Sequence, residues 1–408
     1  MMVTLIRLFH FYRRPSKYVV ASFLLIIAMV FVWRIRFIPS RKMAPTPPAP
    51  LLLDSHKYIL SWENYYMITD YDDLQCPVNN CIFTHDKNLY NGDYSQFDAV
   101  LFYERSLTLP VEYLPINRTS SQLYVFATIE SSYNYPACEL YFDNFFNWTM
   151  TYRLNSDIGW PYFVVRNLTG HILAPSVNVK WPNHKDIPIS PNVIEKLANK
   201  TRAAGWLVSH CRAESMRDEY LTRLQEHLYH FSLQIDVFGA CSNIRCRYSS
   251  CEEMFTRDYY FYMAFENSFD EDYVTEKVLH GYDNYAVPIV YGGANYTRFL
   301  PPGSYINARE YHPYNLAYLI HQAIKHPSIY HEYFRWRHFY TIDAGPPGTH
   351  PLCKLCAALN TNTIGRKTYD KFRLWWNLPN GMKWCLSPSF WNEITLLHID
   401  NKHIVNMY

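Results

Sequence analysis

The chain has 408 residues, of which 49% are hydrophobic, 17% aromatic and 18% charged. This length and composition exclude a wholly disordered protein and predict two or three folded domains. Eight basic side chains and no acidic one lie within residues 1–42, so the rest of the chain is acidic although the net charge is +2. Nucleic-acid binding requires a basic surface, and this balance excludes nucleic acid as a partner.

An uncharged run near the N-terminus predicts a membrane anchor. Residues 18–33 contain no charged side chain, and as a helix they would span about 24 Å, enough for a thin bilayer. Basic residues lie on both sides and no cleavage pattern of a signal peptide follows, so we interpret the run as an uncleaved anchor. Residues 1–17 would then be a cytosolic tail, and the proline-rich residues 34–60 a stem.

Two features of the remaining chain predict a luminal location. All ten cysteines lie beyond residue 75, which favours disulfides in an oxidising compartment. There are also five N-glycosylation sequons, at Asn117, Asn147, Asn167, Asn199 and Asn295. A tail, a single span, a stem and a large luminal body together describe a type II membrane protein of the Golgi, with its catalytic body in the lumen.

The first luminal domain is predicted over residues 61–190. Ala99–Tyr103 and Leu123–Thr128 are short β-branched and aromatic runs typical of parallel strands. Glu130 lies just past the second run. Ligands of open α/β sheets bind at the carboxyl ends of the strands, so Glu130 is a candidate functional residue.

A second α/β domain is predicted over residues 191–365, after a linker at Pro182–Pro191 that is rich in proline and polar residues. A doubly wound arrangement fits its pattern. Pro288 cannot donate to a central ladder, so we place it at the start of its strand. The expected strands are Trp206–Ser209, Leu233–Phe238 closed by Gly239, Tyr259–Phe265 and Ala286–Tyr291, and a helix is expected over Glu214–Tyr229. Residues 366–408 form an unassigned C-terminal extension.

The densest cluster of functional residue types follows the strand Tyr259–Phe265. Asp272 is predicted to cap a helix beginning near Tyr273, whose free N–H groups would favour a phosphate, with Lys277 one turn further on. Arg217 begins a second strand-to-helix junction that could reach the same phosphate. The alternative is that Lys277 and its neighbour Glu276 decorate a solvated helix face.

A different kind of sugar-nucleotide site is suggested by an Asp-x-Asp pattern. Asp70 and Asp72 could hold a divalent ion on a nucleotide sugar, as in metal-dependent glycosyltransferases. The pattern has low specificity and precedes the first predicted βαβ unit. We therefore interpret it as an exposed turn and keep the metal-dependent enzyme as an alternative.

Several motifs resemble the α1,3-fucosyltransferase family, glycosyltransferase family ten. Phe265–Ser268 (FENS) and Tyr273–Lys277 (YVTEK) resemble its donor motif, and the likeness covers about residues 95–360. The cysteine pattern from Cys211 to Cys251 is similar to the invertebrate and N-glycan-core branch. There are two departures: His210 stands where the family usually has Asn, and the segment after Glu130 lacks the usual Pro.

The resemblance implies a GT-B arrangement, two Rossmann-like domains facing a cleft, and inverting transfer from GDP-L-fucose. It implies that Glu130 is the general base, which suits a carboxylate at a strand end. It also implies roles on the donor. Arg217 and Lys277 would stabilise the leaving diphosphate, while Asn267, Tyr273 and Glu276 would contact the donor. These cations would replace a metal, so no cofactor is required, although stimulation by a divalent cation stays open.

The cysteines allow more than one interpretation. Cys353 and Cys356 could be half of a zinc site. An oxidising lumen favours disulfides instead, and the family resemblance places this pair in a C-terminal bridged segment. Cys76 and Cys81 could pair locally. The disulfide candidates are Cys76, Cys81, Cys211, Cys241, Cys246, Cys251, Cys353 and Cys356.

The predicted function is transfer of fucose in α1,3 linkage to GlcNAc of glycoprotein glycans, either the N-glycan core or N-acetyllactosamine. A catalytically inactive, membrane-anchored glycan-binding protein of the same fold is the non-enzymatic alternative. The departures at His210 and after Glu130 motivate it. The sequence predicts neither the choice of acceptor nor the oligomeric state.

Overall fold

The computed structural model describes residues 56–63, 71–115, 117–182, 187–242, 244, 251–377 and 385. The predicted tail and anchor, and the predicted stem up to residue 55, lie outside this part of the chain. Among the described residues, no helix is both long and apolar enough to cross a membrane. The stem prediction is wrong at its end, because Lys57–Ser61 is a buried strand.

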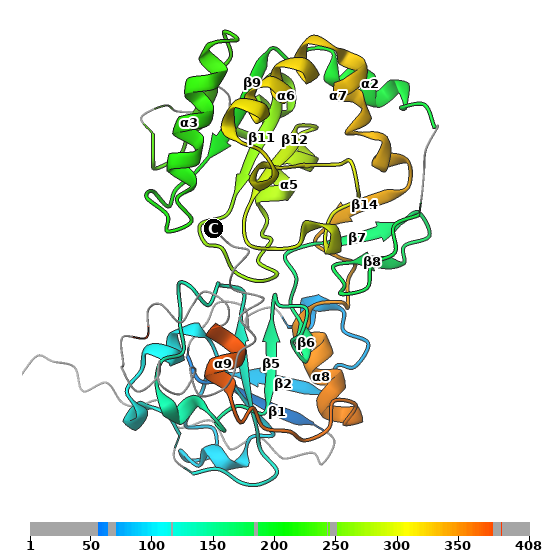
Figure 1. Ribbon diagram of the computed structural model, residues 1–408. Coiled ribbons are helices and arrows are strands. Elements are labelled where there is room, and N and C mark those ends of the chain that lie inside the picture. The colour runs from blue at the N-terminus through cyan, green and yellow to red at the C-terminus, as the bar shows by residue number, and fades with distance from the viewer. Residues whose placement is uncertain are drawn as a thin grey trace, which may run out of the picture. The chain divides into compact units, whose positions relative to one another are not determined.

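The first sheet has six parallel strands in the order β2-β1-β3-β4-β5-β6 (Figure 1). Its strands are β1 (Lys57–Ser61), β2 (Cys81–Thr84), β3 (Ala99–Phe102), β4 (Leu123–Thr128), β5 (Trp148–Thr151) and β6 (Ile158–Gly159). Both strands predicted for this domain are present, because every residue of β3 and β4 is apolar enough to be buried on both faces. The described connections are 3₁₀ helices: η3 (Asp72–Leu74), η4 (Tyr94–Gln96), η5 (Glu104–Thr108), η6 (Val111–Tyr113) and η7 (Leu140–Phe142).

The second sheet has five parallel strands in the order β10-β9-β11-β12-β13. They are β9 (Arg202–Leu207), β10 (Ile235–Phe238), β11 (Tyr259–Phe265), β12 (Val287–Tyr291) and β13 (Ile306–Asn307). The prediction for β11 is confirmed, whereas β9 begins four residues before its predicted start. Pro288 is the second residue of β12 and lies outside the β13 ladder, which pairs only Ile289 and Val290. Gly239 follows β10 at φ +96°, a backbone conformation that glycine favours.

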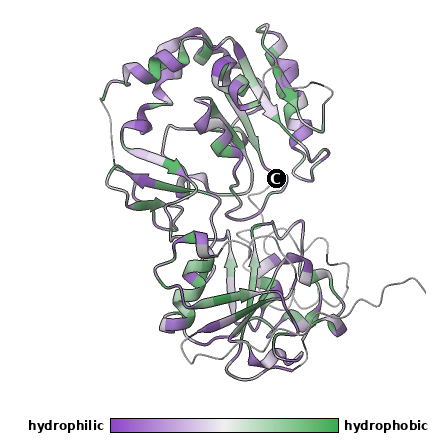
Figure 2. Ribbon diagram, turned by 180° about the vertical axis from the view of Figure 1, so that it is seen from behind, coloured by the Kyte–Doolittle hydropathy of each residue, from purple (hydrophilic) through white to green (hydrophobic). Residues whose placement is uncertain are grey.

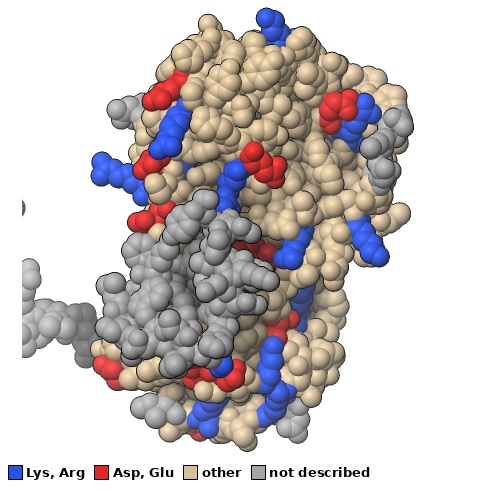
Figure 3. Space-filling model, viewed as in Figure 1, with Lys and Arg blue, Asp and Glu red and all other residues tan. Residues whose placement is uncertain are grey.

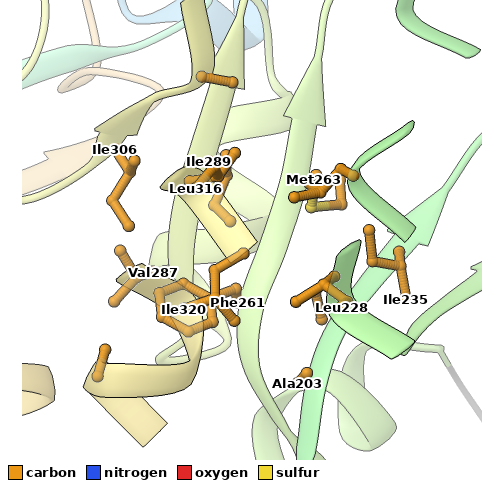
Figure 4. Close-up of a cluster of buried hydrophobic side chains, with 14 of the residues drawn as sticks. Ala203, Leu228, Ile235, Phe261, Met263, Val287, Ile289, Ile306, Leu316 and Ile320 are labelled. Carbon is orange, nitrogen blue, oxygen red and sulfur yellow. The ribbon is translucent and has the colours of Figure 1, made fainter. Parts of the chain in front are cut away.

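Helices cover the second sheet. They are α2 (Pro191–Leu197), α3 (Arg217–Tyr229), α4 (Cys251–Asp258), α5 (Lys277–Asp283), α6 (Pro313–Lys325) and α7 (Pro327–Glu332), with the 3₁₀ helices η8 (Tyr296–Arg298), η9 (Ala308–Glu310) and η10 (Arg335–His338). Apolar side chains of α3 and α6 pack on apolar side chains of β9, β11 and β12, as Leu228, Phe261 and Ile320 illustrate (Figure 4). Figure 2 shows the same division, with hydrophobic strands inside and mixed helices outside. The prediction of an α/β fold built on two parallel sheets is confirmed.

A small antiparallel sheet, β14-β7-β8, joins segments that are distant in sequence. It contains β7 (Val164–Asn167), β8 (Ile172–Ala174) and β14 (Tyr340–Asp343). Val165 and Tyr340 of this sheet pack into the same apolar cluster as Tyr262 of the second sheet. The predicted linker follows β8. Its residues 183–186 lie outside the described part of the chain, and α2 begins at its last residue, Pro191.

The C-terminal part of the described chain returns to the first sheet. Helix α8 (Pro351–Thr361) buries Leu355 in the same apolar cluster as residues of β1, β3 and β4, and Figure 1 shows the helix beside the first sheet, near β6 and β1. Helix α9 (Phe372–Asn377) buries Phe372 and Trp376 against the other face. Residues 351–365, predicted for the second domain, and residues 366–377, predicted as an extension, therefore contribute to the core of the first sheet.

Disulfides reinforce this return. The described pairs are Cys76–Cys353, Cys81–Cys356, Cys138–Cys385 and Cys211–Cys241. Local pairing of Cys76 with Cys81 is therefore wrong, because each bonds to a cysteine of α8 instead. Cys138 and Cys385 were not among the predicted candidates. Cys251 is disulfide-bonded as well, and Cys246 lies outside the described residues.

Candidate active site

Glu130 lies at the carboxyl end of β4, as predicted. Its backbone N–H donates to Thr128 Oγ1 at 2.9 Å, which holds the chain in a tight turn after the strand. Burial raises the pKa of its carboxyl group, a hydrogen bond with Asn134 lowers it, and the charges of Glu104 and Lys277 act on it in opposite directions. A carboxyl group with a raised pKa is a stronger base once it is ionised, which suits proton abstraction.

The loop after β11 meets the loop after β4 through a buried carboxylate. Asp270 Oδ2 accepts hydrogen bonds from Ser132 N (2.7 Å), Ser132 Oγ (2.6 Å) and Tyr152 Oη (3.0 Å). Ser268 Oγ lies 2.8 Å from Ser131 Oγ. These contacts come from both sheets. They bring Glu130 near the residues of the predicted donor motif.

Lys277 belongs to a buried polar cluster in that motif. Its Nζ lies 3.0 Å from Glu266 Oε2 and 2.8 Å from Thr275 Oγ1. Burial lowers the pKa of Lys277, but Glu266 and Glu276 outweigh it and the net shift is upward, so the side chain stays cationic. Glu266 is 1% exposed and was not singled out in the sequence. Its position directly after the buried strand β11 was the available signal.

The predicted helix start is wrong. The helix after this loop is α5 and begins at Lys277, four residues after Tyr273. Asp272 has a positive φ of 60° and does not cap it. Instead Asp272 Oδ2 accepts a hydrogen bond from Leu154 N at 3.0 Å, and so ties the loop to the end of β5. That contact comes from the other sheet, and no local pattern could have indicated it.

Arg217 has a different environment from the one predicted. It is the first residue of α3 and only 2% exposed. Its terminal nitrogens donate to the carbonyl oxygens of Phe265 and His210, both at 2.6 Å. Arg217 thus fixes the ends of β11 and of the segment after β9, while His210, the residue that departs from the family pattern, is exposed.

The remaining donor candidates differ in their exposure and in their neighbours. Tyr273 is 2% exposed, with its ring centroid 5.0 Å from that of Tyr152 and 6.2 Å from that of Tyr162. Glu276 is exposed, and its Oε1 lies 3.7 Å from Lys277 Nζ. Asn267 is half-buried, and its carbonyl oxygen accepts from Ser215 N at 3.3 Å. Of these candidates, Glu276 is the one whose contact with Lys277 the described residues show.

A pocket of about 550 Å³ includes Ile129, the residue before Glu130, in its lining. Tyr162 lines the same pocket, and its Oη donates to the Ile129 carbonyl oxygen. Trp160, His350 and Lys354 line it further on. Two other hollows, one of about 810 Å³ that includes Trp336, lie around α7 and η10 and contain none of the predicted site residues.

The metal-site alternatives receive no support from the residues described. Cys353 and Cys356 bond to different cysteines, so they do not form half of a zinc site. Asp70 lies outside the described residues, and Asp72 begins η3. Within the described ranges, no group of three or more His, Cys, Asp or Glu side chains is placed to hold a metal ion. On the face drawn in Figure 3, basic and acidic side chains are interspersed.

The five sequons differ in accessibility. Asn117, Asn199 and Asn295 are exposed, and Asn167 is half-buried. Asn147 is 8% exposed, and its side chain accepts from Tyr124 N and donates to the Lys367 carbonyl oxygen, both at 2.8 Å. A glycan on Asn147 is incompatible with this packing, so we no longer count that sequon among the acceptor sites.

The site brings the strand-end carboxyl group of Glu130 near the cation of Lys277, and a carboxylate close to a fixed cation is an arrangement that suits a group-transfer enzyme. Two sequence families match the chain: "Fucosyltransferase, N-terminal" over residues 54–163 and "Glycosyltransferase family 10 (fucosyltransferase) C-term" over residues 197–375. The chain belongs to this fucosyltransferase family. The predicted family and enzyme class are therefore confirmed.

Two relatives from Drosophila melanogaster agree with the predicted invertebrate likeness. Alpha-(1,3)-fucosyltransferase C is 34% identical over 334 residues, which are 78% of this chain and 74% of that protein. Glycoprotein 3-alpha-L-fucosyltransferase A is 29% identical over 75% of this chain, but the match spans only 56% of its own length. A crystal structure of an α1,3-fucosyltransferase with GDP-fucose matches 81% of this chain and 95% of that one, with 16% identity and a TM-score of 0.48.

Proposed function

We propose that the chain transfers L-fucose from GDP-L-fucose in α1,3 linkage to GlcNAc of glycoprotein glycans, with inversion at the anomeric carbon. One observation carries this proposal. Glu130 follows β4 of the first sheet, and the next two residues, Ser131 and Ser132, are hydrogen-bonded to Ser268 and Asp270 of the loop that leads from the second sheet to Lys277. A base and a cation so placed can serve the two ends of one displacement.

In this reaction Glu130 takes the proton of the acceptor 3-hydroxyl as its oxygen attacks the fucose anomeric carbon. The bond from that carbon to the β-phosphate oxygen breaks, and GDP leaves with the electron pair. Lys277 offsets the charge that develops on the diphosphate, while Asn267, Tyr273 and Glu276 orient the donor. Arg217 acts through the backbone at Phe265 and His210, because its terminal nitrogens are already engaged there.

The acceptor class and the location belong to the same proposal. The name of the second Drosophila relative, which specifies a glycoprotein, supports a glycoprotein acceptor. The hydrophobic run at residues 18–33 supports a type II membrane protein of the Golgi, with Asn117, Asn167, Asn199 and Asn295 as glycan acceptors in the lumen. In cells whose plasma membrane alone is permeabilised, antibody should reach an N-terminal tag but not a C-terminal one.

The test is a transfer assay with the purified full-length chain in detergent. GDP-fucose is supplied with two glycans, one exposing core GlcNAc and one carrying only N-acetyllactosamine, and the products are weighed by mass spectrometry. We expect a gain of one deoxyhexose, and the glycan that gains it identifies the acceptor. Glu130→Gln should lower turnover by about 10³-fold while GDP-fucose still binds.

Glu112→Gln is the matched control, because Glu112 is an exposed glutamate of the same region. It should keep wild-type turnover. Binding of GDP-fucose without transfer to either glycan would contradict the proposal and favour the inactive glycan-binding protein. Loss of activity in a chelator would instead favour the metal-dependent enzyme that uses Asp70 and Asp72.

A further inference from the structure

Three neighbouring strands of the first sheet end in the same way. Glu63, Glu104 and Glu130 each lie two residues past the last residue of β1, β3 and β4, respectively. These strands are adjacent, because β3 pairs with β1 on one side and with β4 on the other. The glutamates therefore form a row along the carboxyl edge of the sheet, and we call it the glutamate row.

Glu104, the middle member of the glutamate row, is linked to the backbone of Glu130 through the hydroxyl group of Thr128. Glu104 is 5% exposed, and its Oε2 accepts from Thr128 Oγ1 at 2.9 Å. The same hydroxyl oxygen accepts from Glu130 N at 2.9 Å. A hydroxyl has a single proton, and since Thr128 gives it to Glu104, its lone pairs face the Glu130 backbone. Glu104 thereby sets the direction of the hydrogen bond that holds Glu130.

Charge couples the row as well. The titratable and charged groups that act on Glu130 or lie beside it are Glu104, Glu276, Lys277, Tyr162 and Tyr273. After burial, which is the largest cause, Glu104 is the first group whose negative charge raises the pKa of Glu130. Glu63 lies on the far side of Glu104, and burial together with the Glu104 charge raises its pKa to about 7.

We propose that Glu104 is a positioning residue for Glu130: through Thr128 it fixes the Glu130 backbone, and its negative charge makes the Glu130 carboxylate a stronger base. The inference rests on the proposed function, in which Glu130 is the general base. It adds a residue that touches neither donor nor acceptor. It also separates two effects, a hydrogen bond that places the base and a charge that sets its strength.

The charge is tested with Glu104→Gln in the full-length chain. Glutamine keeps an oxygen that can accept from Thr128 but removes the negative charge. Glu130 should then stay ionised to lower pH, so the acidic limb of kcat/KM should move by about 0.5 to 1 pH unit toward acid. The weaker base should also lower the plateau kcat by about twofold. Glu112→Gln, the exposed control, should leave the limb in place.

The hydrogen bond is tested with Thr128→Val and Thr128→Ser. Valine keeps both charges and removes the hydroxyl, so kcat should fall by about tenfold with little change in the KM for GDP-fucose and no shift of the acidic limb. Serine restores the hydroxyl and should recover most of kcat. Equal kcat values for the Val and Ser variants would overturn the positioning role.

Glu130→Gln is measured beside these variants to distinguish a wrong assignment of the base from a wrong assignment of the positioning residue. If Glu130→Gln keeps wild-type turnover, the proposed base is wrong and the inference falls with it. If Glu130→Gln is inactive but the Glu104→Gln limb does not move, the inference alone is overturned and the base assignment stands. Binding of GDP-fucose reports folding, and if Glu104→Gln fails to bind it, the Thr128 pair decides the outcome.

Discussion

The carboxyl ends of the two sheets differ in the charged side chains that they hold. The first sheet ends in the carboxyl groups of Glu63, Glu104 and Glu130, whereas beside the end of β11 the second sheet holds two cations, Arg217 and Lys277, of which Lys277 is paired with the buried carboxylate of Glu266. A carboxylate can take a proton from an alcohol, and fixed cations can stabilise a leaving diphosphate. In the proposed reaction, each sheet therefore serves one end of the transfer.

The two sheets also differ in what holds them together. Short 3₁₀ helices join the described strands of the first sheet, and three of the described disulfides tie its loops to residues 353, 356 and 385. The second sheet is covered by α-helices that follow its strands closely in sequence. Its described disulfide, Cys211–Cys241, joins cysteines only 30 residues apart. The first sheet is thus held together by segments that are distant in sequence, whereas the second sheet is held together by helices that are close to its strands in sequence.

The largest effect is expected from removing both bridges of α8. Cys76–Cys353 and Cys81–Cys356 have separations of 277 and 275 residues, but with one intact the other closes only a short loop. Removing either pair with serines should cost about 2 kcal/mol, and removing both should cost more than about 5 kcal/mol. Urea unfolding followed by tryptophan fluorescence measures this.

Cys211→Ser with Cys241→Ser is the control from the second sheet. This single short-range bridge should cost about 3 kcal/mol. If the loss of stability on removing both α8 bridges equalled the sum of the two single losses, the first sheet would not depend on a long-range link that either bridge can provide. The comparison of the sheets would then rest on charge alone.

A second prediction concerns the carboxylate that joins the two sheets. Asp270→Asn replaces one carboxylate oxygen with an NH₂ donor. Oδ2 accepts from Ser132 and Tyr152 and Oδ1 accepts from Glu271 N, so either orientation of the amide leaves at least one of these donors without its acceptor. We expect a loss of about 3 kcal/mol of stability in thermal unfolding. Glu271→Gln is the neighbouring control, because Glu271 is 46% exposed and should contribute less than about 1 kcal/mol.

The sequence predicted best those elements whose burial is uniform. Tyr259–Phe265 is apolar throughout and became β11 without a change of boundary. The strand β9 was predicted too late, because it begins with Arg202 and small residues that lack a clear strand pattern. The local sequence pattern indicates which face of a strand or helix is buried. Whether a polar residue at a strand end joins the sheet depends instead on the neighbouring strands with which it pairs.

The candidate site shows the same limit. Glu130 could be predicted because a strand end is a local feature, whereas the conformation around Asp272 is fixed by Leu154, more than a hundred residues away. The partners of Cys353 and Cys356 were also out of reach, since spacing says nothing about which loops meet in space. Arg217 was predicted from its place at a strand-to-helix junction and from the resemblance, but neither indicated that its terminal nitrogens donate to the backbone carbonyl oxygens of Phe265 and His210.

A third prediction concerns Glu63, one of the three glutamates at the end of the first sheet. The pKa of Glu63 is about 7 in the folded chain, raised from 4.5 mainly by burial. Between these two values the folded chain binds more protons than the unfolded chain, so stability falls as pH rises through this window. The loss attributable to Glu63 from pH 5 to 7.5 should be about 2 kcal/mol. Above pH 7.5 its contribution should no longer change.

Urea unfolding at several pH values compares the wild type with Glu63→Gln. The variant cannot release this proton, so its stability should lack this decline. Glu112→Gln should follow the wild-type profile, because Glu112 is exposed. Identical pH profiles for the wild type and Glu63→Gln would show that Glu63 is already ionised in the folded chain at pH 5.

The smallest effect is expected from Arg217→Lys, on the cationic side. Lysine keeps the charge but cannot span the carbonyl oxygens of Phe265 and His210 together, so stability should fall by about 1 to 2 kcal/mol. Arg223→Lys, on the exposed face of the same helix, should change nothing measurable. If Arg217 acts through the backbone, the KM for GDP-fucose should rise by less than about tenfold. Unchanged stability with a much larger rise in KM would mean that Arg217 contacts the diphosphate directly.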